Sequence, residues 1–204
     1  PPQHNIRLIF QFGEEGAGGA ERMIEGGALD GVDEIYAYHV CPELEVGKFA
    51  SAPGALFAGT VEFDVTFTGR ASHCATREQG IDALHAAAKF VRDLPEIVEP
   101  FRNNALLHVG KLTAGSARNI VADKAVAECS FRFFDEADRE NGMMRLERKL
   151  VKITNATGAD HTVVVHSVYR PLINSAYALE RFKRFADVEE IAPRYTAEDF
   201  SAYC

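Results

Sequence analysis

Cysteines in this 204-residue chain are few and widely separated, at Cys41, Cys74, Cys129 and Cys204. No two of them form a Cys-x-x-Cys pair, so neither a zinc knuckle nor a disulfide framework is indicated. A reducing compartment, the cytoplasm, is therefore the expected location. The chain starts Pro-Pro-Gln without a methionine and stops without a closing helix or strand. We therefore expect it to be a piece of a longer protein whose true amino terminus is not in view.

Long apolar runs and an excess of basic residues are also missing. No segment approaches the roughly 18 to 20 apolar residues that span a bilayer. The net charge of −8 and the pI near 5.4 argue against nucleic acid or an anionic membrane as the partner, because nothing neutralises a run of phosphates. The composition, with 47% hydrophobic and 25% charged residues, is typical of a globular protein. We expect the partner to be a small molecule or another subunit.

The amino-terminal part predicts a βαβ unit. Residues 6–12 form a short apolar run that ends at a glycine, residues 17–27 have the spacing of a small amphipathic helix, and residues 33–40 have the pattern of a second strand. Two strands joined by one short helix should be parallel, with a right-handed crossover. Their carboxyl ends then meet at the edge of the sheet where open parallel sheets bind ligands.

An acidic pair, Glu14 and Glu15, follows the first of these expected strands, and His39 lies near the end of the second. Two carboxylates and an imidazole are suitable ligands for Zn, Mn, Co or Ni. A second carboxylate beside a ligand is well placed to take a proton from metal-bound water. The alternative is that the glutamates belong to a solvated turn and that the histidine is an ordinary surface group.

The glycine-rich turn raises the question of phosphate binding. Residues 16–21 begin like a dinucleotide-binding fingerprint, but Glu21 occupies the position of the third glycine and no Gly-Lys-Ser/Thr follows. Two glutamates inside the loop would also repel a pyrophosphate. The sequence therefore excludes a Rossmann or P-loop assignment.

Residues 54–170 predict a self-contained domain. Alternating apolar and polar residues predict strands at 60–68, 106–112, 125–133 and 162–169. A helix is expected to start at residue 81 and to end where Pro95 disrupts it, and a second helix is expected from a cap at Asp135 to Gly158. The order β-α-β-β-α-β is that of a ferredoxin-like fold, a four-stranded antiparallel sheet with two helices on one face.

The remaining carboxyl-terminal part, residues 171–204, is short. It contains one expected helix, 176–185, and an acidic loop. The α/β sheet begun near residue 7 would resume here. We therefore interpret residues 1–53 and 171–204 as the first part and the resumed, incomplete part of one catalytic α/β domain, into which residues 54–170 are inserted.

Several motifs, spread over nearly the whole chain, are similar to those of one family. Phe-Gln-Phe-Gly-Glu-Glu at 10–15 is similar to the family's Phe-Gln-Pro-x-Glu-Glu, and Tyr-His-Val-Cys-Pro at 38–42 is similar to its Gly-x-His-x-x-Pro. Further similarities follow in the family's order at 69–75, 80–83, 115–121, 131–132 and 198–201. The chain thus resembles the dimetal aminoacylase and carboxypeptidase-like amidohydrolases, which include hippurate hydrolases, N-acetyldiaminopimelate deacetylases and indoleacetyl-amino-acid hydrolases. This resemblance implies part of a metallopeptidase-type α/β catalytic domain with an inserted ferredoxin-like lid and dimerisation domain.

The resemblance also implies a metal site. It implies divalent metal ions, two per site, with Glu15 and His39 among the ligands and Glu14 as the general base that acts on a metal-bound water. The implied reaction is hydrolysis of the amide bond of N-acyl amino acids or small peptides.

Residues of the lid are implied to hold the substrate. In the family, the histidine that matches His73 reaches across a homodimer to the partner's active site, where it would stabilise the oxyanion. Asn119 and Arg132 match positions that hold the substrate carbonyl and carboxylate, and a guanidinium suits a carboxylate because it binds it bidentately. The structural alternatives are a histidine that starts a helix, an asparagine in a turn and an arginine in solvent.

The chain departs from the family in one large respect. The family's first metal-binding motif, His-x-Cys-Gly-His-Asp, is absent, as is the histidine that closes the site near the carboxyl terminus. Two ligands do not define a tight site, so we expect this piece alone to bind metal weakly and to be inactive. Two hypotheses remain open: a fragment of an amidohydrolase, and a noncatalytic dimerisation or binding module without a complete metal site.

Overall fold

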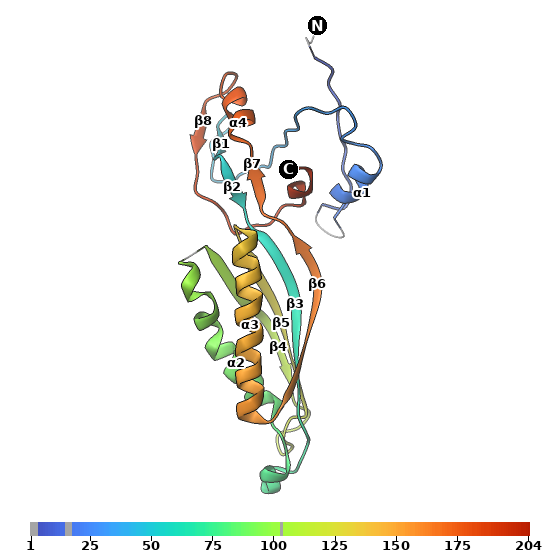
Figure 1. Ribbon diagram of the computed structural model, residues 1–204, viewed down its shortest axis with the longest axis vertical. Coiled ribbons are helices and arrows are strands. Elements are labelled where there is room, and N and C mark those ends of the chain that lie inside the picture. The colour runs from blue at the N-terminus through green and yellow to red at the C-terminus, as the bar shows by residue number, and fades with distance from the viewer. Residues whose placement is uncertain (1–3, 15–17, 103) are drawn as a thin grey trace. The chain divides into compact units, whose positions relative to one another are not determined.

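The computed structural model describes residues 4–14, 18–102 and 104–204, which form two compact units (Figure 1). The first unit is Pro1–Gly59 together with Tyr169–Cys204, and the second unit is Thr60–Val168. The expected domain at 54–170 contains the whole second unit. It also contains the strand β2 (Gly54–Phe57), which pairs inside the first unit.

The second unit has the predicted ferredoxin-like fold. Its elements are β3 (Gly59–Thr68), α2 (Ala83–Val98), β4 (Ala105–Ala114), β5 (Lys124–Phe133), α3 (Glu136–Thr157) and β6 (Asp160–Tyr169). The four strands form one sheet in the order β4-β5-β3-β6, with both helices over the same face (Figure 1). Short 3-10 helices at Cys74–Gln79 and Glu99–Phe101 lie in the connections on either side of α2.

The core of the second unit lies between the sheet and the two helices. Phe63, Val65 and Phe67 of β3 are fully buried and pack in one cluster with Phe90 of α2 and Leu150 of α3. Side chains in a strand alternate between the two faces of the sheet. The alternation of residue types that predicted β3 therefore reflects the burial of one face only.

The predicted ends of α3 are confirmed, whereas the predicted end of α2 is wrong. Asp135 caps α3 by accepting a hydrogen bond from the amide of Ala137 at 2.7 Å, and the helix ends at Gly158, whose φ is +77°, as predicted. The predicted break of α2 at Pro95 is wrong, since the helix continues to Val98. A proline removes one helical hydrogen bond, and burial of Ile97, which is 2% exposed, offsets that loss in the following turn.

The first unit is built from short elements. The strands β1 (Phe49–Ser51) and β8 (Val188–Glu190) pair in parallel, and β2 pairs with β7 (Leu172–Asn174) in antiparallel fashion. Helices α1 (Ala20–Glu25) and α4 (Ala176–Phe182) and the 3-10 helix η3 (Asp199–Tyr203) complete it. Among the residues that the structure describes, no helix is long and apolar enough to cross a bilayer.

The predicted βαβ unit near the amino terminus is wrong. The helix α1 forms, but residues 6–12 and 33–40 have no strand structure, and side chains such as Phe10 and Val40 are 85% and 86% exposed. A strand exists only where a second strand supplies hydrogen-bond partners, and no described strand pairs with either segment. The first segment is instead held by side chains, for example by Arg7, whose guanidinium donates to the carbonyl oxygens of two residues after α1.

Candidate metal centre

Three carboxylates of the first unit come together from distant parts of the sequence. Glu14, Glu198 and Asp199 each offer one oxygen, and these oxygens all lie within 4.8 Å of one another. Glu14 is exposed, Glu198 is half-buried and Asp199 is 5% exposed. Like charges this close repel one another, and a bound divalent cation would remove the repulsion.

Asp199 lies at the first residue of η3 and is bonded on both of its oxygens. The side-chain amide of Gln11 donates to Oδ1 at 2.8 Å and to Oδ2 at 2.7 Å. The backbone amides of Gly19 and Ala20, where α1 begins, donate to Oδ2 at 3.0 and 3.4 Å. The carboxylate is therefore fixed in place by donors of the protein itself.

Glu198 forms the cap of η3 and faces the exposed carboxylate of Glu14. Its side chain accepts a hydrogen bond from the amide of Phe200 at 3.5 Å. Burial raises the pKa of Glu198 above its ordinary value, the charge of Glu14 raises it further, and His39 acts in the opposite direction. Such a carboxyl group holds a proton more readily than an isolated glutamate does.

His39 is exposed and has one ring nitrogen free for a metal. Its Nδ1 lies 2.7 Å from the carbonyl oxygen of Val40. A carbonyl oxygen only accepts, so the proton of the neutral ring is on Nδ1 and the lone pair of Nε2 is available as a ligand. The predicted ligand Glu15 lies outside the described residues.

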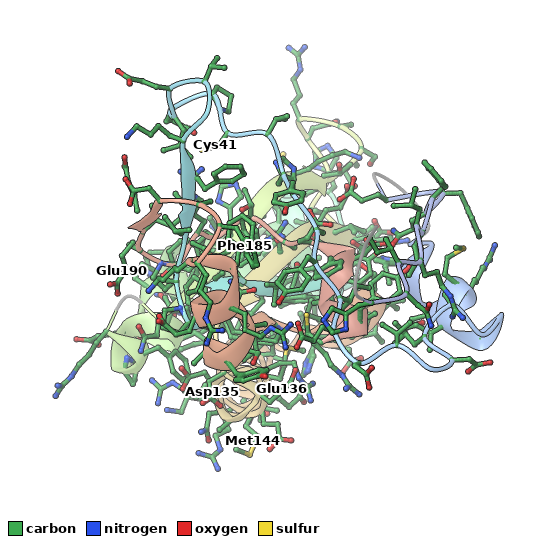
Figure 2. The ribbon with its side chains drawn as sticks, turned by 90° about the horizontal axis from the view of Figure 1, so that it is seen from above. Cys41, Asp135, Glu136, Met144, Phe185 and Glu190 are labelled. Atoms are coloured by element: carbon green, nitrogen blue, oxygen red, sulfur yellow. The ribbon has the colours of Figure 1, made fainter. Side chains whose placement is uncertain are left out.

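A thiol two residues after His39 is already engaged. Cys41 (Figure 2) donates to Oε2 of Glu43 at 2.9 Å and accepts from Nη2 of Arg194 at 3.4 Å. These contacts occupy its sulfur. We therefore do not count it among the candidate ligands.

The second unit brings His73 and Asn119 onto adjoining loops. The carbonyl oxygen of Asn119 accepts from the amide of Cys74 at 2.9 Å, and both side chains are exposed. Nδ1 of His73 accepts from the amide of Ala75 at 3.2 Å, which places the proton of the neutral ring on Nε2. An N–H donor of this kind can stabilise an oxyanion when a substrate lies against it.

Arg132 projects from β5 and already has partners. Its Nη2 lies 3.1 Å from Oε1 of Glu62 and its Nε donates to Oγ of Ser130, also at 3.1 Å. A substrate carboxylate would therefore compete with Glu62 for this guanidinium. The predicted site residues thus fall into two groups, each described within its own unit.

Glu198 and Asp199 were not among the site residues that the sequence predicted. Their motif, Glu-Asp-Phe-Ser, carries part of the family resemblance, but no function followed from it. The usable signal was a pair of acidic residues inside a shared motif. Only the fold shows that this pair meets Glu14.

Comparison with known proteins agrees with the family resemblance. Residues 58–157 match the family model M20_dimer, described as a peptidase dimerisation domain. The chain is 34% identical over 212 residues to an N-acetyldiaminopimelate deacetylase of Bacillus subtilis (strain 168), covering 98% of the chain and 56% of that protein. It is 33% identical over 207 residues to an N-acetyl-L-cysteine deacetylase of the same organism, covering 97% of the chain and 50% of that protein.

Solved structures show the same relationship. A dinuclear metal binding peptidase of the M20 family from Bacillus subtilis superposes with a TM-score of 0.80 and 25% identity, covering 96% of this chain and 51% of that one. An aminobenzoyl-glutamate utilization protein from Klebsiella pneumoniae superposes with a TM-score of 0.75 and 27% identity, covering 95% and 51%. The chain therefore spans about half the length of the relatives it matches.

The second unit is thus a peptidase dimerisation domain. The chain is a homologue of the N-acetyldiaminopimelate deacetylases, and a solved M20 peptidase is among its structural neighbours.

Proposed function

We propose that this chain is part of a metal-dependent amidohydrolase that cleaves the amide bond of N-acyl amino acids or small peptides. The observation that carries the proposal is the cluster of Glu14, Glu198 and Asp199 in the same unit as His39, whose Nε2 is free. The names of the homologous deacetylases support an acetylated amino acid as the substrate.

The donor set fits divalent metal ions. Carboxylate oxygens and one imidazole nitrogen are ligands that Zn, Mn, Co and Ni all accept. We propose two ions per site, with Glu15 and His39 among the ligands. When bound, such ions lower the pKa of water and polarise the substrate carbonyl.

The chain's own residues have separate tasks in this proposal. Glu14 accepts the proton of the attacking water and returns it to the leaving amine. The Nε2–H group of His73 donates to the oxyanion that forms on the carbonyl. Asn119 holds the substrate carbonyl, and Arg132 binds its carboxylate in competition with Glu62.

The assembly that we propose is a homodimer formed through the second unit. The match to a peptidase dimerisation domain supports it. His73 of one subunit then serves the site of the other. We also propose that the protein works in the cytoplasm.

The test uses the full-length protein that contains this chain. We expect it to release acetate from N-acetyldiaminopimelate or N-acetyl-L-cysteine, to lose the activity with a chelator and to regain it with a divalent metal. Failure of the metal-loaded protein to hydrolyse any N-acyl amino acid would contradict the proposal. The chain would then be a noncatalytic dimerisation or binding module.

A further inference from the structure

Glu14 directly follows Gly13, whose carbonyl oxygen accepts a hydrogen bond from the amide of Gly18 at 3.0 Å. Both glycines have positive φ, +68° and +69°, a conformation that side-chain-bearing residues rarely adopt. A Cβ at Gly19 would overlap the carbonyl oxygen of Phe12, so the two arms that flank Glu14, residues 11–13 and 18–20, are in direct contact.

Asp199 binds both of these arms at once. On the arm before Glu14, the side-chain amide of Gln11 reaches both carboxylate oxygens. On the arm after it, the amides of Gly19 and Ala20 reach Oδ2. The partners are 188, 180 and 179 positions away in the sequence, and Asp199 is 5% exposed. A buried carboxylate with charge-assisted hydrogen bonds is a strong anchor, because each bond of this kind exceeds a neutral one in strength.

We infer that Asp199 is a positioning residue that fixes the two arms around Glu14 and thereby the place of the Glu14 carboxylate. The inference rests on the proposed function, in which Glu14 is the general base. Both oxygens of Asp199 are already bonded to Gln11, Gly19 and Ala20, so in this inference Asp199 is not itself a metal ligand and acts only through those residues. A displacement of about 1 Å at a catalytic group reduces a rate by about 100-fold, so the activity should depend on the anchor that fixes the residues on either side of Glu14.

The sharpest test exchanges the donor and the acceptor. Gln11→Glu places a carboxylate against Asp199 and should lower kcat about 100-fold while KM stays within about a factor of two. Asp199→Asn alone should have a small effect, because Gln11 can turn its amide and present oxygen to the new NH2 group. The double variant Gln11→Glu/Asp199→Asn restores one donor facing one acceptor and should recover most of the lost kcat. Asp199→Ala, which removes every acceptor, should behave like Gln11→Glu.

The matched control is Asp135→Ala. Asp135 lies at the start of α3 (Figure 2) and also accepts a hydrogen bond from a backbone amide, but in the second unit. This variant should lower the melting temperature without changing kcat. The inference is wrong if the double variant is no better than Gln11→Glu, or if Asp199→Ala reduces kcat no more than Asp135→Ala does.

A second readout separates this inference from the proposed function. Hydrogen exchange at the amides of Gly19 and Ala20 reports the anchor directly, whether or not the protein hydrolyses the substrates offered. Exchange should be faster in Gln11→Glu and in Asp199→Ala, and slow again in the double variant. If the wild type is inactive but this pattern holds, the proposed function fails and the anchor stands. If exchange is unchanged in all variants, the anchor is wrong.

Discussion

The carbonyl oxygen of Asn119 accepts a hydrogen bond from the amide of Cys74 at 2.9 Å, which joins two loops of the second unit by their backbones. An antiparallel bridge between His73 and Ile120 extends the same junction. Because backbone groups make these contacts, the exposed side chains of His73 and Asn119 are free to act on a ligand. Either side chain can be removed while the junction remains.

Removal of the proposed base should separate catalysis from metal binding. Glu14→Gln keeps the size of the side chain but cannot accept a proton, so hydrolysis by the full-length protein should fall by a factor of about 100 to 10,000. Metal content, measured by elemental analysis, should stay near that of the wild type. Glu25→Gln, an exposed glutamate of α1, serves as the control and should change neither quantity. Unchanged turnover in Glu14→Gln would remove Glu14 from the mechanism.

Removal of a proposed ligand should give the opposite pattern. His39→Ala deletes the free Nε2 and should weaken metal binding about 10-fold or more. The loss is measured by titration with zinc or manganese, and excess metal should restore part of the activity. His85→Ala, which changes an exposed histidine of α2, should bind metal as the wild type does. Equal affinities for the two variants would show that His39 is not a ligand.

The close approach at Gly19 should make the loop sensitive to a single methyl group. Gly19→Ala pushes a Cβ into the carbonyl oxygen of Phe12 and should destabilise the protein by about 1–3 kcal/mol, with loss of hydrolysis. Gly26→Ala, at the other end of α1, meets its nearest atoms at 3.4 and 3.5 Å and should be tolerated. Urea unfolding measures the stability of both variants. Equal stability of the two variants would contradict the close approach of Gly19 to Phe12.

The buried thiol Cys129 should resist alkylation, whereas the exposed thiol Cys74 should react. Burial raises the pKa of Cys129 from 9.0 to about 12, so it remains protonated and unreactive in the native state at pH 9. Its contribution to stability is complete below the ordinary value and is lost as pH rises through about 12. Alkylation followed by mass spectrometry at pH 9 should therefore modify Cys74 and leave Cys129 unmodified. Equal labelling of the two would contradict the burial of Cys129.

The proposed dimer predicts complementation between two inactive variants of the full-length protein. If His73 acts in the partner's site, subunits with Glu14→Gln mixed with subunits with His73→Ala should form heterodimers in which one site has both residues intact. Activity should return to a fraction of the wild-type value, and each variant alone should still be dimeric by light scattering. If subunits exchange and no activity returns, His73 does not act across the interface.

Local signals in the sequence were sufficient to predict much of the secondary structure of the second unit. The cap at Asp135 and the glycine at 158 set the ends of α3 by interactions within a few residues. The alternation in β3 likewise records the burial of one face. These features could be predicted because the residues that cause them are neighbours in the chain.

Contacts between residues far apart in the sequence decided the features that could not be predicted. Residues 6–12 have the composition of a strand but no strand partner among the described residues, and Pro95 stays helical because Ile97 is buried by other elements. The sequence shows the motifs that contain Glu14, Glu198 and Asp199. It does not show that the three carboxylates lie close together in the fold. A carboxylate cluster depends on where the backbone brings residues more than 180 positions apart, and hydrogen bonds such as that of Gln11 to Asp199 form only once tertiary packing has placed both partners.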